Sequence, residues 1–151
     1  MKLSVKADYA VRALLDLAER YGEGPTPCHE IAARERIPGP FLDQLLMSLR
    51  RAGLVHSTRG PRGGHALAAP PEQVSLAAVV DALEGAAEVP AGRVEDEPQH
   101  AAALREVLGR ADAAARTVLE ETSLAQVLQS SRGERVFHGI YRLAPRVTPS
   151  R

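Results

Sequence analysis

The sequence lacks the features of an exported, membrane-spanning or disulfide-stabilised protein. It has a single cysteine, which excludes an intrachain disulfide, a CxxC redox pair and any all-cysteine metal site. No apolar run approaches the roughly 18 residues that a membrane helix needs. Charged residues in the N-terminal segment MKLSVKADYA interrupt the apolar stretch that a signal peptide requires. We therefore expect a cytoplasmic protein with no membrane partner.

Enzyme and metal motifs are also missing from the sequence. It contains no GxSxG, P-loop or dinucleotide fingerprint, and no Cys/His pair at a useful spacing. The five histidines are scattered and show neither HxxxH nor HExxH spacing. The acidic run Glu95-Asp96-Glu97 is more typical of a solvated loop than of a cation site. We expect no catalytic residue, no metal and no cofactor.

The charge is balanced overall but unevenly distributed along the chain. Residues 1–70 hold ten Lys/Arg and seven Asp/Glu, whereas residues 71–151 hold nine and twelve. The segment between Asp43 and Glu72 contains no acid and four arginines: Arg50, Arg51, Arg59 and Arg62. A neutral protein can therefore carry an electropositive surface suited to nucleic acid.

Apolar spacing predicts three helices in the first half of the chain. The first covers residues 4–21, with Ser4 as its N-cap and Tyr21 at the end of its apolar stripe. A short second helix covers about residues 27–35. The third covers residues 41–52 after a tight, proline-rich turn. Its predicted inward face comprises Leu42, Leu45, Leu46 and Leu49.

A β-hairpin is predicted to follow the third helix. Residues 54–59 alternate as a strand, Gly60-Pro61-Arg62-Gly63-Gly64 forms a turn, and residues 65–67 return. The order of helix, helix, tight turn, helix and hairpin is that of a winged helix-turn-helix. We therefore expect a mainly α fold with a small β-hairpin wing.

The second half of the chain is predicted to be helical, with a long loop and a basic tail. Ser75 caps a helix that ends at Glu84, and residues 85–99 form a loop. A long helix covers about residues 100–121, and a last turn or two ends at Leu128. The apolar positions of the long helix step by 4, 3, 4 and 3 residues, as in a coiled coil: Leu104, Leu108, Ala111, Ala115 and Val118.

These elements divide the chain into four predicted parts. Residues 1–84 form a winged helix-turn-helix domain, residues 85–99 a loop, and residues 100–128 a dimerisation helix region. Residues 129–151 form an arginine-rich tail, for which a docked strand, a short helix and disorder all remain open.

The helix after the tight turn is the expected DNA-reading element, because this helix lies in the major groove in winged helix-turn-helix proteins. Its outward positions are predicted to be Phe41, Gln44, Ser48 and Arg51. Glutamine can contact adenine, and an exposed phenylalanine can pack on a thymine methyl. At the hairpin tip, Arg59 and Arg62 could enter a minor groove or contact phosphate. The alternatives are a core role for Phe41 and a solvated role for Gln44 and Ser48.

Four segments together resemble the Rrf-two (Rrf2) family of bacterial winged-helix regulators. They are MKLSVKADYAVRALLDLA, EIAARERIPGPFLDQLLMSLRRAGLVHSTRGPRGGHALA, VSLAAVVDALEG and EETSLAQVL. The resemblance implies a homodimer joined through the long helix and bound to a palindromic operator in double-stranded DNA. It also implies base contacts by Phe41 and Gln44 and a minor-groove contact by Arg59. Our phosphate-contact candidates are Lys6, Arg50, Arg51 and Arg62.

The sequence departs from the cluster-binding members of this family in the loop after the ALEG motif. Those members carry three cysteines there, whereas this chain has AAEVPAGRVEDEPQ. Since a [2Fe–2S] cluster needs four ligands, mostly thiolates, we expect none of the family type. Cys28 lies elsewhere, where a small buried residue is favoured over a redox sensor.

Two functional hypotheses follow. The first is a sequence-specific, dimeric transcriptional regulator that acts as a repressor, since family members commonly occlude promoters. The alternative is a protein-interaction regulator that docks a metabolic enzyme or other partner through the 85–99 loop or the tail. In either case the effector, a small molecule or a protein, is not identified by the sequence.

Overall fold

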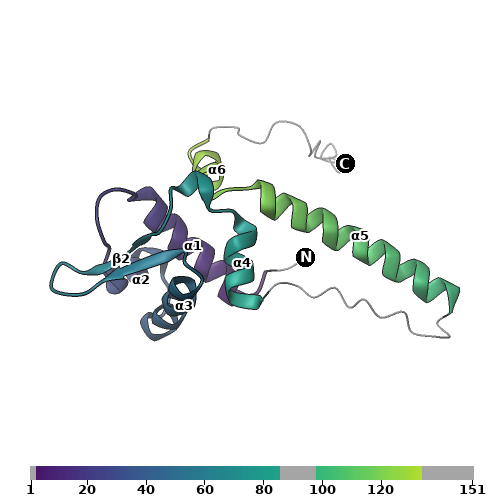
Figure 1. Cartoon of the computed structure of the whole chain (residues 1–151), viewed down its shortest axis with the longest axis horizontal. Coiled ribbons are helices and arrows are strands. Elements are labelled where there is room, and N and C mark those ends of the chain that lie inside the picture. Colours follow the sequence, from purple (N-terminus) through teal and green to yellow (C-terminus); the bar gives the residue numbers. More distant parts are fainter. Residues whose placement is uncertain (1–2, 86–97, 134–151) are drawn as a thin grey trace, which may run out of the picture.

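The computed structural model describes residues 3–85 and 98–133, so most of the predicted loop and tail lies outside it (Figure 1). Its elements follow in this order: α1 (Val5–Glu19), α2 (Cys28–Glu35), α3 (Gly39–Arg51), β1 (Val55–Thr58), β2 (Gly64–Leu67), the 3-10 turn η1 (Pro71–Gln73), α4 (Leu76–Glu84), α5 (Gln99–Glu121) and α6 (Leu124–Ser131). The expected mainly α fold with one small antiparallel hairpin is confirmed. None of the helices in these two ranges has the length and apolarity to cross a membrane.

Helix α1 is the centre of the hydrophobic core. Ser4 caps it as predicted, because the Ser4 hydroxyl accepts a hydrogen bond from the Ala7 amide at 3.2 Å. Its buried stripe, which includes Leu14 and Leu17, packs with α2, α3, α4 and α6. The prediction for Tyr21 is wrong. The helix ends at Glu19, so Tyr21 leaves the stripe and its side chain is 48% exposed.

A buried ion pair fixes α2 against α1. The Asp16 carboxylate is only 4% exposed and receives two hydrogen bonds from the Arg34 guanidinium, at 2.6 and 2.9 Å. This bidentate contact raises the pKa of Arg34 above its ordinary value. Since the two residues come from different helices, the pair helps to hold α2 on α1, together with the ion pair between Arg12 and Glu35.

The hairpin is anchored to the body at its second strand. Strands β1 and β2 pair from Val55 with Leu67 to Thr58 with Gly64. In addition, the backbone of His65 exchanges two hydrogen bonds with Thr26, at 2.8 and 2.7 Å, in the segment that precedes α2. Strand β1 is one residue shorter at each end than the predicted 54–59, and β2 begins one residue before the predicted 65–67.

Helix α5 extends away from the rest of the molecule (Figure 1). Its C-terminal end joins the body through two backbone hydrogen bonds, from Leu76 to Thr122 and from Leu124 to Val74, both at 2.9 Å. Arg116 on α5 also donates to the Asp81 carboxylate on α4 at 2.5 and 2.7 Å, which lowers the pKa of Asp81. These contacts hold the C-terminal end of the arm on the body.

Helix α6 returns the chain to the core. Ser123 and Gln126 form a reciprocal capping box at its start. The Leu124 side chain is fully buried among residues of α1 and its neighbours. The predicted dimerisation region 100–128 therefore includes a helix, α6, that packs on the body formed by α1 and its neighbours.

Candidate nucleic-acid interface

A tight turn places α3 across α2. Arg36 ends α2 in the left-handed conformation, with φ 53° and ψ 45°, and the buried Ile37 follows it. The carbonyl of Pro38 then accepts hydrogen bonds from the amides of Phe41 and Leu42, at 3.1 and 2.9 Å. Pro40 suits the first turn of α3, because the first helical turn leaves amides without partners. Helix α3 consequently begins at Gly39, two residues before the predicted start.

The buried side of α3 is the predicted leucine stripe, and its exposed side defines the reading face. Leu42, Leu45, Leu46 and Leu49 are all buried, which confirms that prediction. The reading face, as we use the term, comprises the exposed residues Asp43, Gln44, Met47, Arg50 and Arg51. It combines a hydrogen-bonding amide, an apolar side chain and two guanidinium groups, which is the chemistry that reads base edges and phosphates.

Two of the predicted base-contacting residues lie at the borders of this face. Phe41 is half-buried, and its ring packs edge-on against Tyr9 at a centroid distance of 5.7 Å. Ser48 is also half-buried, and its hydroxyl donates to the carbonyl of Gln44 at 3.2 Å. Their contacts with DNA stay predictions. Both side chains offer less accessible surface for such a contact than Gln44 does.

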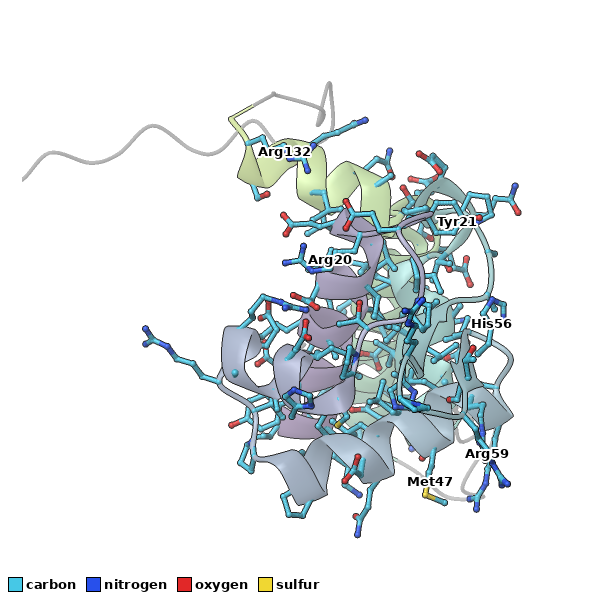
Figure 2. All side chains as sticks on the ribbon, turned by 90° about the vertical axis from the view of Figure 1, so that its left-hand side faces the viewer. Arg20, Tyr21, Met47, His56, Arg59 and Arg132 are labelled. Atoms are coloured by element: carbon cyan, nitrogen blue, oxygen red, sulfur yellow. The ribbon has the colours of Figure 1, made fainter. Side chains whose placement is uncertain are left out.

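The hairpin tip presents two arginines. The turn is closed by a 2.9 Å hydrogen bond from the Gly63 amide to the Gly60 carbonyl. Arg59 precedes this turn and Arg62 lies within it, and both side chains are exposed. Figure 2 shows Met47 and Arg59 projecting toward the same end of the view, with Arg132 at the opposite end.

His65 connects the hairpin to the reading face electrostatically. Burial lowers the pKa of His65 below 6.5, while the nearby charges of Asp43 and Arg50 act on it in opposite directions. Its Nδ1 also lies 2.9 Å from the Ser57 hydroxyl across the hairpin. Strand β1 also packs against α3, so α3 and the hairpin adjoin at the base of the wing. Lys6 is exposed on the first turn of α1, and no contact among the described residues joins it to this surface.

Sequence reasoning missed Met47 and Asp43. It counted outward positions from Phe41, which rotated the predicted face by part of a turn. Counting from the side opposite the leucine stripe would have identified Met47, since successive residues differ by about 100°. Met47 is 46% exposed on a face that would otherwise be polar.

Cys28 lies at the start of α2 in a setting that suppresses thiolate formation. Burial, followed by a hydrogen bond to the Asp43 carboxylate and that group's negative charge, raises the pKa of Cys28 to about 12. A thiol of this kind is a poor nucleophile at neutral pH.

We expect Cys28 to react slowly with thiol reagents. At pH 8 the fraction of Cys28 present as thiolate is roughly 1000-fold below that of an ordinary cysteine. A thiolate of higher pKa is intrinsically more nucleophilic, which offsets part of this difference, so we expect a labelling rate about 50-fold lower. Stopped-flow labelling with 5,5′-dithiobis(2-nitrobenzoate), folded against urea-unfolded protein, measures the ratio. Equal rates in the two states would contradict the buried, Asp43-bonded thiol.

Comparison with known proteins agrees with this geometry. Residues 3–130 match the Rrf2 family model, described as an iron-dependent transcriptional regulator. CymR of Bacillus subtilis, an HTH-type transcriptional regulator, is 35% identical over 141 residues, which cover 93% of this chain and 99% of CymR. The solved CymR structure, that of the global cysteine regulator of B. subtilis, superposes with a TM-score of 0.75 at 35% identity, over 86% of this chain and 98% of that chain.

A further relative matches the N-terminal half more strongly. The Synechocystis sp. protein slr0846, assigned as an HTH-type transcriptional regulator, is 52% identical over 84 residues. That alignment covers 56% of this chain and 57% of the Synechocystis protein, so it spans little more than half of each. The family match over nearly the whole described chain and the full-length similarity to CymR lead to one conclusion: this chain belongs to the Rrf2 family of transcriptional regulators.

Proposed function

We propose that this chain is a homodimeric, sequence-specific regulator that represses transcription by occupying a palindromic operator. The observation that carries the proposal is the adjacency of α3, which bears the reading face, and the arginine-bearing hairpin, whose strand β1 packs against α3. A helix in the major groove and a wing beside it can read one half-site together.

Individual roles follow from exposure. Gln44 and Met47 are the central base-reading residues, since an amide can pair with adenine and a thioether can pack on a thymine methyl. Phe41 and Ser48 contribute from the borders. Arg59 enters the minor groove. The remaining cationic candidates contact phosphates: Lys6, Arg50, Arg51 and Arg62.

Dimerisation is assigned to the projecting arm. None of the 23 residues of α5 is buried, and this includes its large apolar residues. Leu104, Val107 and Leu108 are 60%, 58% and 56% exposed. Ala111 is exposed as well, whereas Ala115 and Val118 are half-buried nearer the body. A helix with an exposed apolar stripe is stabilised when a second copy covers it. Residues 1–84, together with α6, form the proposed DNA-binding unit.

Specific binding is tested on the DNA upstream of the chain's own gene. Fluorescence anisotropy with a labelled promoter fragment and with a scrambled fragment of equal composition gives the two affinities at one salt concentration. We expect the chain to bind the promoter at least 1000-fold more tightly than the scrambled fragment, which is the lower end of the usual ratio of specific to non-specific affinity. Equal affinities would contradict sequence-specific regulation.

The wing contact gives a residue-level prediction. Arg59→Ala is expected to weaken promoter binding by about 1–3 kcal/mol, roughly 5- to 150-fold, because a minor-groove contact is lost. Arg132→Ala removes the same charge at the opposite end of the molecule and serves as the matched control (Figure 2). Similar losses of promoter affinity in both variants would show that Arg59 contributes only through its charge and makes no specific contact.

An iron–sulfur cluster does not fit the residues of this chain. The only cysteine is Cys28, whose thiolate is disfavoured, and no group of three potential metal-ligating side chains occurs in the described ranges. A cluster generally needs four ligands, mostly thiolates. We therefore propose regulation without a family-type cluster.

Anaerobic reconstitution with iron and sulfide checks this proposal. The expected visible spectrum has no stoichiometric [2Fe–2S] absorption, and iron analysis after desalting gives well below one cluster per chain. A cluster-containing relative treated in parallel controls for the procedure. A stoichiometric cluster spectrum from this chain would overturn the proposal.

A further inference from the structure

Two contacts join α5 to the body at different points along the helix. At its C-terminal end, the backbone of residues 122–124 is hydrogen-bonded to that of residues 74–76. Nearer the middle of α5, the guanidinium of Arg116 holds the carboxylate of Asp81 on α4. Arg116 and Thr122 are about 9 Å apart along the helix axis. One attachment fixes the position of the end of α5, whereas two attachments fix its direction.

The contact between Arg116 and Asp81 is directional. Both terminal nitrogens of Arg116 donate to the two carboxylate oxygens of Asp81, at 2.5 and 2.7 Å. Two parallel hydrogen bonds from a planar guanidinium fix the orientation of the groups that they join as well as their distance. Both side chains are half-buried, so solvent ions screen the pair less than an exposed one. The half-buried apolar residues of the same stretch, Ala115, Val118 and Leu119, contribute burial that has no such directionality.

Helix α4 connects this pair to the helix that bears the reading face. It packs against both α1 and α3. The Val79 side chain of α4 is fully buried and belongs to the same core cluster as Leu46 and Leu49 of α3. The Ser75 hydroxyl caps the start of α4 by accepting from the Ala78 amide at 3.2 Å. A change in the angle between α4 and α5 therefore moves the reading face relative to the arm.

The arm converts a small change of angle into a large displacement. Residues 102–114 of α5 are all exposed, and Figure 1 shows this part of the helix extending away from α4. Leu104, in the exposed apolar stripe, lies about 18 Å from Arg116 along the helix axis. A tilt of about 10° at Arg116 displaces Leu104 by about 3 Å, close to the rise of roughly 3.4 Å per base pair. The angle between α4 and α5 must therefore be held within a few degrees to align two reading heads on DNA.

We propose that Asp81 and Arg116 form a positioning pair, which sets the direction of the arm relative to the reading face and thereby the half-site spacing that the dimer accepts. Neither residue contacts DNA in this assignment, since the pair acts through α4 and α5. A symmetric dimer binds half-sites whose separation matches that of its two reading helices. The inference rests on the proposed function, a dimer that is joined through the arm and bound to a two-part operator.

Three single variants separate this role from a general effect of charge. Arg116→Lys retains the positive charge but cannot donate two parallel hydrogen bonds. Asp81→Asn removes the charge and one of the two acceptor oxygens. Glu120→Gln is the matched control: the Glu120 carboxylate accepts from Nε of Arg116 at 2.7 Å, but it lies on α5 itself and cannot orient α5 against α4. Light scattering and circular dichroism at 222 nm measure the mass and helicity of each variant.

Spacing preference is measured by anisotropy on the promoter operator with one base pair inserted or removed between its half-sites. Each change shifts the half-sites by roughly 3.4 Å and rotates them by about 35°. We expect the parent chain and Glu120→Gln to bind the altered operators roughly 100-fold more weakly, because the second half-site no longer engages. Arg116→Lys and Asp81→Asn should lose less than about tenfold, because a pivoting arm lets both heads engage.

A single half-site provides the readout that a merely destabilised protein would change. We expect all three variants to bind a fragment with one half-site as tightly as the parent chain does. Full spacing discrimination in Arg116→Lys or Asp81→Asn, or its loss in Glu120→Gln, would overturn the proposal. Weaker half-site binding by Arg116→Lys would also overturn it, since the pair would then affect the reading head itself.

The direction of the arm is also measured without DNA. Amide residual dipolar couplings of the parent chain should fit one orientation of α5 relative to α1 and α4, whereas those of Arg116→Lys should fit no single rigid arrangement. Couplings that fit one arrangement equally well in both proteins would overturn the pair as the orienting contact. If the parent chain does not distinguish promoter from scrambled DNA, the proposed function fails, and the couplings still decide whether the pair orients the arm.

Discussion

A Leu104→Glu, Leu108→Glu double variant is expected to be monomeric. Both side chains lie on α5, more than half exposed, in a helix that has no buried residue of its own. In a dimer through this arm, each substitution removes an apolar contact twice, once per copy. At about 1.5–3 kcal/mol for burying one leucine, even partial burial makes the total loss several kcal/mol. The dimer dissociation constant should rise by roughly 1000-fold or more.

The opposite side of the same helix supplies the matched control. Ala102 and Ala113 are exposed and lie roughly 160–180° around α5 from Leu104. The Ala102→Glu, Ala113→Glu double variant therefore adds the same charge without touching the apolar stripe. Light scattering after size-exclusion chromatography measures the mass of each. A dimeric Leu variant, or monomers in both cases, would contradict dimerisation through this stripe.

Loss of the dimer should also weaken operator binding. A dimer engages two half-sites, and the second contact is intramolecular, which contributes roughly 100- to 10,000-fold in apparent affinity. We expect the monomeric variant to lose this factor while its circular dichroism at 222 nm remains that of a helical protein. Promoter affinity that is unchanged in a monomer would show that one reading head suffices.

Local patterns in the sequence predicted the local structure well. The spacing of Leu42, Leu45, Leu46 and Leu49 identified the buried side of α3, and Ser4 and Ser75 cap their helices as predicted. These features depend on neighbours within one turn, so the sequence records them directly. The sequence pattern placed Tyr21 on the helix because the apolar spacing continues across Arg20 and Tyr21, which α1 does not include.

Features that join distant segments could not be predicted in this way. The Asp16–Arg34 pair and the approach of His65 to Asp43 and Arg50 both depend on how the helices and the hairpin pack together. Neither spacing nor composition encodes such contacts without the fold. The reading face was partly predictable, since Met47 lies opposite the leucine stripe in the sequence, and the structure adds that its side chain is 46% exposed.

A Gly64→Ala substitution is expected to detach the wing from the body. A Cβ atom at Gly64 would lie 2.3 Å from the backbone carbon and oxygen of Thr26, and 2.7 Å from the nitrogen of Pro27. Backbone atoms cannot rotate away as a side chain can, so β2 must move. The two hydrogen bonds between Thr26 and His65, at 2.8 and 2.7 Å, are then lost.

The expected cost is about 3 kcal/mol, from two backbone hydrogen bonds at about 1 kcal/mol each and the strain of a positive φ. For a domain of this size that corresponds to a fall of roughly 6–12 °C in Tm. Gly60→Ala is the matched control, because Gly60 also has a positive φ, of +109°, but a Cβ atom added there would meet nothing within 4 Å. Its cost is limited to backbone strain, about 1 kcal/mol.

Thermal unfolding followed at 222 nm compares the two variants, and amide hydrogen exchange at Thr26 and His65 localises the damage. We expect fast exchange at both amides in Gly64→Ala and protected amides in Gly60→Ala, because only the first substitution separates β2 from the segment before α2. Promoter affinity should fall further in Gly64→Ala, since an undocked hairpin no longer holds Arg59 in place. Equal melting temperatures and equal protection in the two variants would contradict the close approach at Gly64 as the anchor of the wing.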